Sequence, residues 1–309
     1  MWAIETRALR KVFRPLYGGT PIVAVDSLDL QVPVGGVFGL LGPNGAGKTT
    51  TIQILIGNVR PTSGEAFVLG HKAGAVQAKR KLGFLPEKFQ FHDFLTAEEF
   101  LKMHGQLAKM NPKHLRKRID EVLELVGLAE RRRSRIREFS KGMQQRVGLA
   151  QAIIHDPDLV ILDEPTSALD PLGRRRVREV VQYLKSQGKT VILNSHLLSE
   201  VEMSCDRVAI LNKGRLVKQG TLEELLVNRS VVTLELKQIT PAVLEALQRV
   251  AVKVDPIDER RVVVEVSNED QVPELAQAVV YAGGALMGMQ AKRETLEDLF
   301  IQTVEGEAK

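Results

Sequence analysis

Short apolar runs and amphipathic segments alternate along most of the chain. The run 159–162 is Leu-Val-Ile-Leu, and an unbroken apolar run is typical of a strand buried on both faces of a parallel sheet. In 115–127, apolar residues recur three and four positions apart, which predicts a helix with one apolar face. We expect strands at 4–13, 22–32, 37–41, 65–70, 82–86, 159–162, 190–193 and 207–211, and helices at 49–57, 96–110, 115–127, 144–155 and 174–187. This alternation predicts an α/β domain, with a half-exposed antiparallel part at 22–32.

The C-terminal part has a pattern of its own. We expect strands at 231–237, 251–254, 261–266 and 285–291, and helices at 241–250, 271–282 and 295–300. The order β-α-β-β-α-β predicts a small α+β unit of the ferredoxin-like type. The charge changes sign at the same place, from +11 over the first 230 residues to −6 beyond them. We therefore expect one domain at 1–228, with a helical subdomain at about 88–156, and an accessory or regulatory domain at 229–309.

Composition limits the classes of protein that this chain can be. The longest apolar runs have about five residues, against roughly 20 needed to cross a bilayer, and we expect no signal peptide. The single cysteine, Cys205, excludes an internal disulfide and is expected to be a buried structural thiol. The net charge of +5 would suit a nucleotide, an anionic membrane surface or nucleic acid, and does not choose among them.

The stretch from Gly42 to Thr50 reads GPNGAGKTT and lies between a predicted strand and a predicted helix. It fits the pattern of a phosphate-binding loop, in which glycines let the backbone N–H groups form a concave cradle. The positive end of the following helix would face the phosphates. Lys48 would supply a charge to the β- and γ-phosphates, and the Thr49 hydroxyl a ligand to Mg²⁺. The alternative is an ordinary glycine-rich turn before a helix.

Three polar residues follow two of the predicted buried strands. Asp163 ends one strand, at the edge where open α/β sheets place their ligands, and could hold Mg²⁺ through water. Glu164 could orient or deprotonate an attacking water. His196 follows the next strand and could reach a γ-phosphate. The alternative is a structural acid pair with an unrelated histidine.

Five motifs in order make residues 1–225 similar to the ATP-binding subunits of ABC transporters. Gly42–Thr50 matches the Walker A loop, and Leu159–Glu164 matches Walker B. Phe139–Met143, followed by Gln144-Gln145-Arg146, matches the signature. Ser167–Asp170 matches the D-loop, and His196 matches the switch histidine. The resemblance implies a P-loop, RecA-like ATPase core that uses ATP and Mg²⁺. It also implies a head-to-tail dimer with each ATP between the Walker A loop of one subunit and the signature of the other, so that Ser140 and Gly142 act in trans.

The resemblance assigns roles to particular residues. The implied catalytic residues are Glu164, His196 and Lys48. The implied contacts to ATP are Phe13, Gly42, Asn44, Gly45, Ala46, Gly47, Lys48, Thr49, Thr50, Ser140, Gly142 and Asp170. The implied magnesium contacts are Thr49, Glu87 and Asp163.

The chain departs from the family pattern in three places. The signature has Lys141 and Met143 where many members have Gly and Gln, and Met143 cannot make the amide hydrogen bonds of Gln. Glu87 stands at the Q-loop position and offers no amide donor. Residues 14–21 resemble an insertion, so either Phe13 or Tyr17 would stack on adenine; we favour Phe13.

Gly220-Thr221 before 222–225, and the segment 295–300, resemble the exporter branch, which handles drugs, lipids, polysaccharides or sodium. We therefore expect a peripheral ATPase at the cytoplasmic face of the cell membrane. Its partners would be a separate transmembrane permease and a second ATPase subunit, with a homodimer favoured. The alternative, a non-transport ABC ATPase acting on nucleic acid or ribosomes, usually has tandem domains or a long coiled coil. Neither is present in the sequence, so we expect no nucleic acid partner.

Overall fold

The computed structural model describes residues 1–15, 18–167, 169–226, 230–293 and 295–306. The chain divides into two compact units, Met1–Gly220 with Thr303–Lys309, and Thr221–Gln302. Within the described residues, no helix is both long enough and apolar enough to cross a membrane.

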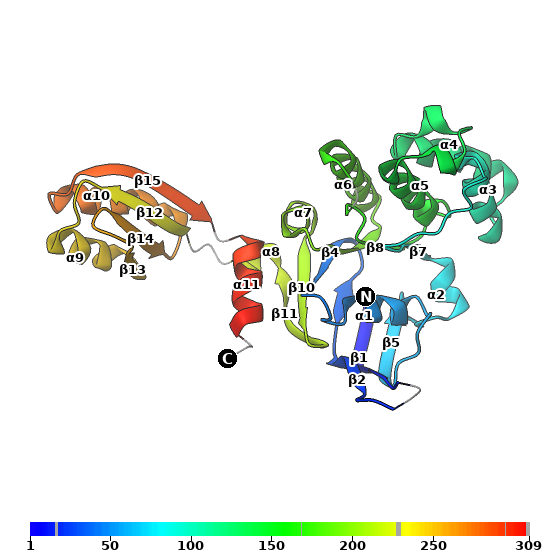
Figure 1. The fold of residues 1–309 in the computed structure, drawn as a ribbon, viewed down its shortest axis with the longest axis horizontal. Helices are drawn as coiled ribbons and strands as arrows, with labels where there is room; N and C mark the ends of the chain where they lie inside the picture. Colours follow the sequence, from blue (N-terminus) through cyan, green and yellow to red (C-terminus); the bar gives the residue numbers. More distant parts are fainter. Residues whose placement is uncertain (16–17, 168, 227–229, 294, 307–309) are drawn as a thin grey trace. The chain divides into compact units, whose positions relative to one another are not determined.

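A six-stranded sheet lies at the centre of the first unit (Figure 1). Its order is β11 (Arg215–Thr221), β10 (Arg207–Asn212), β4 (Gly36–Leu41), β9 (Thr190–Asn194), β8 (Leu159–Asp163) and β7 (Leu82–Leu85). The strands from β10 to β7 are parallel. Every residue of β8 and β9 is buried, as the unbroken apolar run at 159–162 predicts.

Helices flank this sheet on both sides. In Figure 1, α6 (Pro171–Ser186) and α7 (Leu198–Ser204) lie on one side, and α1 (Lys48–Leu55) lies on the other. α1 shares one apolar core with the central sheet and with an antiparallel sheet. Ile54 of α1, Ile161 of β8 and Ile4 of the antiparallel sheet are all at most 2% exposed. α1 is therefore packed against both sheets.

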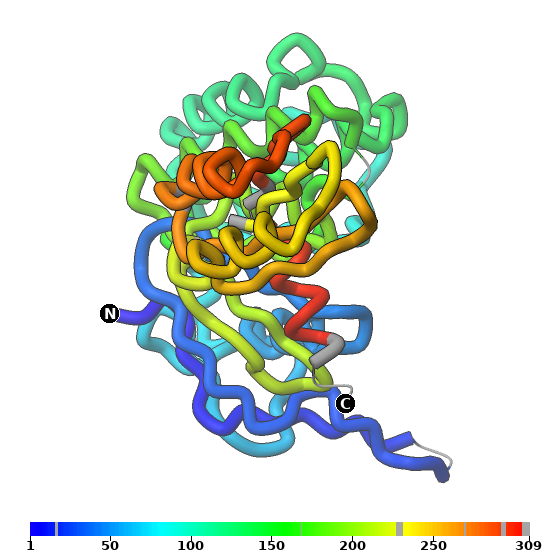
Figure 2. Tube along the Cα trace, turned by 90° about the vertical axis from the view of Figure 1, so that its left-hand side faces the viewer, coloured from blue at the N-terminus to red at the C-terminus, as the bar shows by residue number. Residues whose placement is uncertain are grey.

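The antiparallel sheet has the order β2 (Ile22–Leu28), β1 (Trp2–Phe13), β5 (Ser63–Val68) and β6 (His71–Lys72), and β3 (Gln31–Pro33) also pairs with β1. The predicted strand 22–32 is thus broken after Leu28. The break is stabilised by Thr6, whose hydroxyl donates to Leu28 O and accepts from Leu30 N, both at 2.8 Å. In Figure 2, the end of β1 and the start of β2 project beyond the rest of the sheet.

Three helices form the predicted helical subdomain beside the β7 edge of the central sheet (Figure 1). They are α3 (Ala97–Leu107), α4 (Pro112–Leu125) and α5 (Lys141–Ile153), with 3₁₀ turns at Ala129–Arg131 and Ile136–Glu138. Thr96 caps α3 in a capping box with Glu99. The apolar face of α4 is buried, as its spacing predicts. The pattern did not predict the short helices α2 (Val76–Arg80) and α7, or strand β11.

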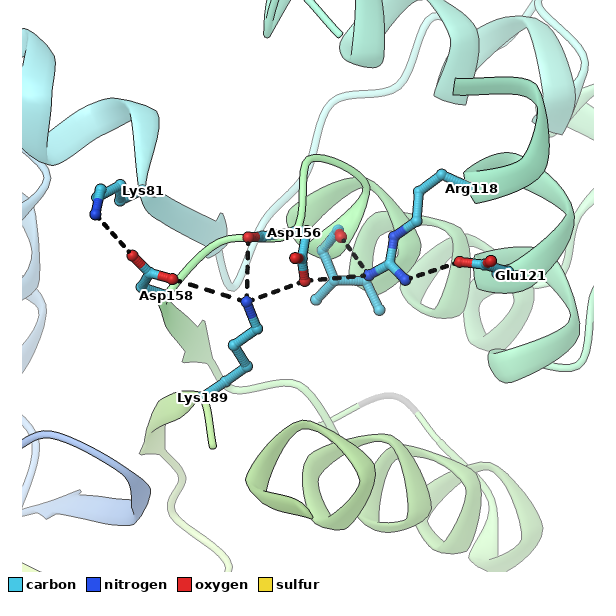
Figure 3. A network of polar contacts seen from close by, with 7 residues as sticks. Lys81, Arg118, Glu121, Asp156, Asp158 and Lys189 are labelled. Carbon is cyan, nitrogen blue, oxygen red and sulfur yellow. Dashed lines mark hydrogen bonds and ion pairs between the residues drawn. The ribbon is translucent and has the colours of Figure 1, made fainter. Parts of the chain in front are cut away.

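A polar network attaches α4 to the starts of β8 and β9 (Figure 3). The Arg118 guanidinium donates to Ile153 O at 3.2 Å and lies 3.9 Å from Asp156 Oδ1. Lys189 Nζ lies 3.0 Å from the same Asp156 oxygen and 3.7 Å from Asp158 Oδ1. Both cationic side chains are only 16% exposed, so they are better shielded than a surface ion pair. The network therefore links the helical subdomain to the starts of the two strands that end in Asp163 and Asn194.

The second unit has one antiparallel sheet with two helices packed against it. The sheet order is β13 (Lys253–Pro256), β14 (Arg261–Val266), β12 (Ser230–Leu236) and β15 (Leu286–Arg293). Its core joins strand residues such as Val232 and Val264 to α9 (Pro241–Val250) and α10 (Val272–Tyr281). This is the ferredoxin-like topology that the order of elements predicts. The remaining helices are α8 (Leu222–Leu225) and α11 (Leu296–Gly306), with a 3₁₀ turn at Glu269–Gln271.

Candidate functional site

The loop from Gly42 to Gly47 joins β4 to α1, and its glycines are required by its shape. Gly47 has φ 95°, and a Cβ there would lie 2.3 Å from Ala24 O, so no other residue fits. Gly45 has φ 79°, and a Cβ there would meet no atom of the described residues within 4 Å. Within the described part of the chain, no side chain caps the start of α1. The first N–H groups of that helix are therefore available to an anion.

Lys48 is the first residue of α1 and is half-buried. Its Nζ donates to Gly42 O at 2.6 Å and to Pro43 O at 3.1 Å, so the ammonium lies over the loop. Burial lowers the pKa of Lys48, and the charges of Glu164 and Asp163 oppose this shift. The loop lysine and the two carboxylates therefore lie within electrostatic range of one another.

The side chains of the other loop residues differ in exposure. Asn44 and Thr49 are exposed, Thr50 is partly buried and Ala46 is buried. The neighbouring Thr51 is buried, and its hydroxyl donates to Gly47 O at 2.9 Å. Thr49 is thus the most exposed of the three threonines at the start of the helix.

Asp163 is the last residue of β8 and is 3% exposed. The register of the parallel strands places it opposite Asn194, the last residue of β9. Asn194 Nδ2 donates to Asp163 Oδ1 at 2.5 Å. Burial raises the pKa of Asp163, and the Asn194 hydrogen bond opposes that shift. The exposed Glu87, just beyond β7, also raises the pKa of Asp163, so its charge acts at the same edge of the sheet.

Glu164 is held in an unusual backbone conformation beside His196. Its φ is 53°, in the left-handed region, and its N–H donates to Asn194 O at 2.8 Å. Its Oε2 lies 2.6 Å from His196 Nδ1. Burial raises the pKa of Glu164, and the contact with His196 opposes this. A strained backbone at a half-buried carboxylate is typical of functional sites.

A separate cleft of about 810 Å³, which none of Lys48, Asp163, Glu164 and His196 lines, is lined by Ser140, Gly142 and Asp170. Ser140 caps α5 by accepting from Met143 N at 3.3 Å, and Asp170 caps α6 by accepting from Gly173 N at 2.8 Å. Both residues are exposed. The structure thus brings Lys48, Asp163 and Glu164 together with His196, whereas the signature residues form a surface of their own.

Phe13 ends β1 opposite Ile22 and is 42% exposed. Lys11 Nζ lies 4.9 Å from the centre of its ring. An exposed ring can stack on a purine base. The contact of Phe13 with adenine stays a prediction. Tyr17 and Ala168 of the D-loop lie outside the described residues.

The oxygen donors at this edge suit a magnesium ion that is bound mainly through its substrate. In the described ranges no three His, Cys, Asp or Glu side chains cluster as a metal site. Mg²⁺ prefers oxygen, keeps several waters, and commonly takes one or two protein ligands besides phosphates. The Thr49 hydroxyl and the carboxylates of Asp163 and Glu87 fit that requirement.

The sequence did not single out Asn194, and it placed Gln145 in the signature without predicting its contact with Glu164. Asn194 binds Asp163 with its side chain and Glu164 with its backbone. Gln145 Nε2 donates to Glu164 O at 3.4 Å. Neither residue belongs to the acidic pair Asp163-Glu164 at the end of β8. The equal spacing of Asp163 and Asn194 from the starts of their strands is the only signal in the sequence that could have paired them.

Comparison with known proteins identifies the family. The model of the ABC transporter family matches residues 25–167. An uncharacterized ABC transporter ATP-binding protein of Synechocystis is 41% identical over 302 residues, which cover 97% of this chain and 84% of that protein. Bacitracin transport ATP-binding protein BcrA of Bacillus licheniformis is 34% identical, with 98% and 97% covered.

A solved structure supports the same assignment. An ATP-binding cassette, solved as a dimer in a post-hydrolysis state with ADP and Pi, superposes with a TM-score of 0.65 and is 25% identical. The match covers 71% of this chain and 99% of that one. The predicted α/β fold class, the resemblance and the ATPase function are thereby confirmed. The chain belongs to the ATP-binding proteins of ABC transporters and is an ATPase subunit.

Proposed function

We propose that this subunit hydrolyses ATP at the edge formed by Lys48, Asp163, Glu164 and His196, and that it drives export through a separate transmembrane permease. The observation that carries the proposal is the 2.6 Å contact between Glu164 and His196, next to an uncapped helix start that bears Lys48. The names of relatives support the transport role, since one is described as a bacitracin transport protein.

Each side chain has a distinct task in this proposal. Lys48 and the first N–H groups of α1 bind the phosphates, and the exposed Gly45 lets them approach the backbone. Glu164 accepts a proton from, or orients, the attacking water. His196 holds the Glu164 carboxylate in place. Thr49, Asp163 and Glu87 would hold Mg²⁺, which when bound neutralises charge on the phosphate oxygens.

The cleft at Ser140 would complete the site of a second subunit. Ser140, Gly142 and Asp170 are on a surface and not on the Lys48 edge, which is what a shared site requires. The dimeric state of the solved relative supports this arrangement. We infer that the second subunit is another copy of this chain, and that Phe13 stacks on adenine.

The two domains would divide the work. Residues 1–228 form the ATPase domain. The segment 229–309, which has a net negative charge, acts as an accessory domain that braces or regulates the dimer. The protein would lie at the cytoplasmic face of the cell membrane, bound to its permease.

Nucleotide binding tests the proposed site. Lys48→Ala removes charge-assisted contacts worth about 1.5–3 kcal/mol, so affinity for trinitrophenyl-ATP should fall by about 10-fold or more. Lys72→Ala, at an exposed position on β6, is the matched control and should bind as the wild type does. Equal affinity in both variants would exclude Lys48 from the phosphate site.

Affinity capture tests the partner. The native protein, captured from detergent-solubilised membranes, should carry a protein with several membrane spans and little nucleic acid. Recovery of RNA or ribosomal protein in place of a membrane protein would favour the alternative, an ABC ATPase that does not act in transport.

A further inference from the structure

Asn194 holds both acidic residues of the site, although no motif includes it. It ends β9 directly opposite Asp163, and it is 2% exposed. Its Nδ2 donates to Asp163 Oδ1 at 2.5 Å, while its carbonyl accepts the N–H of Glu164 at 2.8 Å. One residue therefore fixes the carboxylate plane of Asp163 and the strained backbone of Glu164.

The chemistry of an amide suits this position. Asp163 is 3% exposed, and a buried carboxylate requires hydrogen-bond donors. A lysine or arginine would supply donors but would also neutralise the charge that attracts a cation. The Asn194 carboxamide donates to one oxygen of Asp163 and adds no charge. The second oxygen of Asp163 is left for other partners, and this contact brings no cation to the carboxylate.

The other end of the same amide provides an independent observation. Among the residues that the structure describes, Asn194 Oδ1 is buried and has no hydrogen-bond partner. Buried acceptors are nearly always paired, and exceptions often mark functional positions. The amide cannot be turned around to relieve this, because Oδ1 would then face Asp163 Oδ1 at the present 2.5 Å. The unpaired oxygen is therefore a second feature that marks this buried amide as a functional position.

We propose that Asn194 is a positioning residue of the ATPase reaction, which orients Asp163 toward the magnesium of Mg²⁺–ATP. The inference rests on the proposed role of Asp163 in holding Mg²⁺. Partners that orient a metal-binding side chain typically change metal affinity or activity by about 10- to 100-fold when they are removed. Asn194 acts through Asp163 and is not itself a catalytic residue.

The test compares two substitutions at opposite ends of β9. Asn194→Leu keeps the branching of the side chain and its number of heavy atoms, and removes the N–H that Asp163 accepts. Thr190→Val is the matched control, because Thr190 is 1% exposed and its hydroxyl accepts from Gly35 N at 2.9 Å. Each variant loses one side-chain hydrogen bond of the same strand, but only Asn194 contacts a carboxylate of the site. Thermal unfolding of both variants confirms that they are folded.

The readout is the affinity of the full-length chain for trinitrophenyl-ATP, titrated with and without Mg²⁺. Without Mg²⁺, both variants should bind as the wild type does, since the loop at Lys48 is unchanged. The gain in affinity on adding Mg²⁺ should fall by about 10-fold or more in Asn194→Leu and remain in Thr190→Val. If Asn194→Leu does not fold, Asn194→Ala lacks the same N–H and replaces it in the comparison.

Three results would count against the inference. A full magnesium effect in Asn194→Leu would exclude the positioning role. An equal loss of affinity with and without Mg²⁺ would assign Asn194 a structural role only. The absence of any magnesium effect in the wild type would instead overturn the proposed function of Asp163, and the inference with it.

Discussion

Replacement of Glu164 by Gln changes the chemistry of the site while leaving its geometry in place. The backbone of residue 164 is held by main-chain contacts, namely its N–H to Asn194 O and its carbonyl to the Ser167 hydroxyl at 3.2 Å. Neither contact depends on the carboxylate. The amide oxygen of Gln can still accept from His196 Nδ1, which lies 2.6 Å from Glu164 Oε2. The variant therefore loses the proton acceptor and little else.

The size of the expected effect follows from that role. A positioned general base contributes about 10²- to 10⁴-fold to a rate, so hydrolysis should fall by about 10²-fold or more. This corresponds to at least about 2.7 kcal/mol in the activation barrier. Nucleotide binding should persist, because the contacts of Lys48 with Gly42 and Pro43 do not involve Glu164. An ATP-bound dimer should accumulate, because ATP hydrolysis, which would let the two subunits separate, is blocked.

Phosphate release measures the rate, trinitrophenyl-ATP binding measures the site, and size-exclusion chromatography with ATP measures the dimer. Glu200→Gln is a suitable control, because Glu200 is also buried, at 8% exposure, and pairs with Arg178. It should hydrolyse ATP at nearly the wild-type rate. Near-normal turnover by Glu164→Gln would remove Glu164 from the catalytic role.

Two further predictions concern stability and the C-terminal part. Burial raises the pKa of Asp163 in the folded state above its ordinary 3.8. The contribution of this one residue to stability is therefore most favourable below that pH and is lost as the pH rises toward the folded value. Asp163→Asn, melted in metal-free buffer, should therefore unfold at a higher temperature than the wild type at neutral pH. That advantage should disappear as the pH falls toward 3.8, and an equal or lower melting temperature at neutral pH would contradict the argument. Truncation after Ser230 should leave ATP affinity intact but change dimerisation or coupling to the permease; lost affinity in a folded truncation would show that the domain assignment is wrong.

The central features of the ATPase core could be predicted because they are local in the sequence. The loop at 42–50 has its glycines, lysine and threonine within one stretch, between a strand and a helix. Asp163 and Glu164 follow an unbroken apolar strand. The starts of α5 and α6 were predicted at 144 and 174, but they lie at Lys141 and Pro171. The caps that set them, Ser140 and Asp170 before Pro171, were readable in the sequence.

Other features depend on contacts between residues distant in the sequence. The break between β2 and β3 is made by Thr6, which lies on a different strand. The pairing of Asp163 with Asn194 depends on the register of two parallel strands. The left-handed backbone of Glu164, with φ 53°, depends on the Asn194 carbonyl. Apolar periodicity predicts the strands but not their register, so it could not reveal these contacts.

In the proposed dimer, each ATP would be bound by Lys48 of one subunit and by Ser140 of the other. Lys48→Ala removes the charge at the loop, and Ser140→Arg places a bulky side chain in the cleft that would cover the partner's nucleotide. Either variant alone has no intact site. A mixed dimer contains one site with both residues unchanged, so ATPase activity should return in part when the two are mixed.

The control is a single chain with both substitutions, mixed with the wild type. Its mixed dimers contain no intact site, so it should only inhibit. The decisive measurement is phosphate release from the Lys48→Ala and Ser140→Arg mixture, with mixed dimers verified by differential tags. Partial recovery of activity is the result that the shared-site account predicts. No recovery despite mixed dimers, or full activity of Ser140→Arg alone, would contradict it.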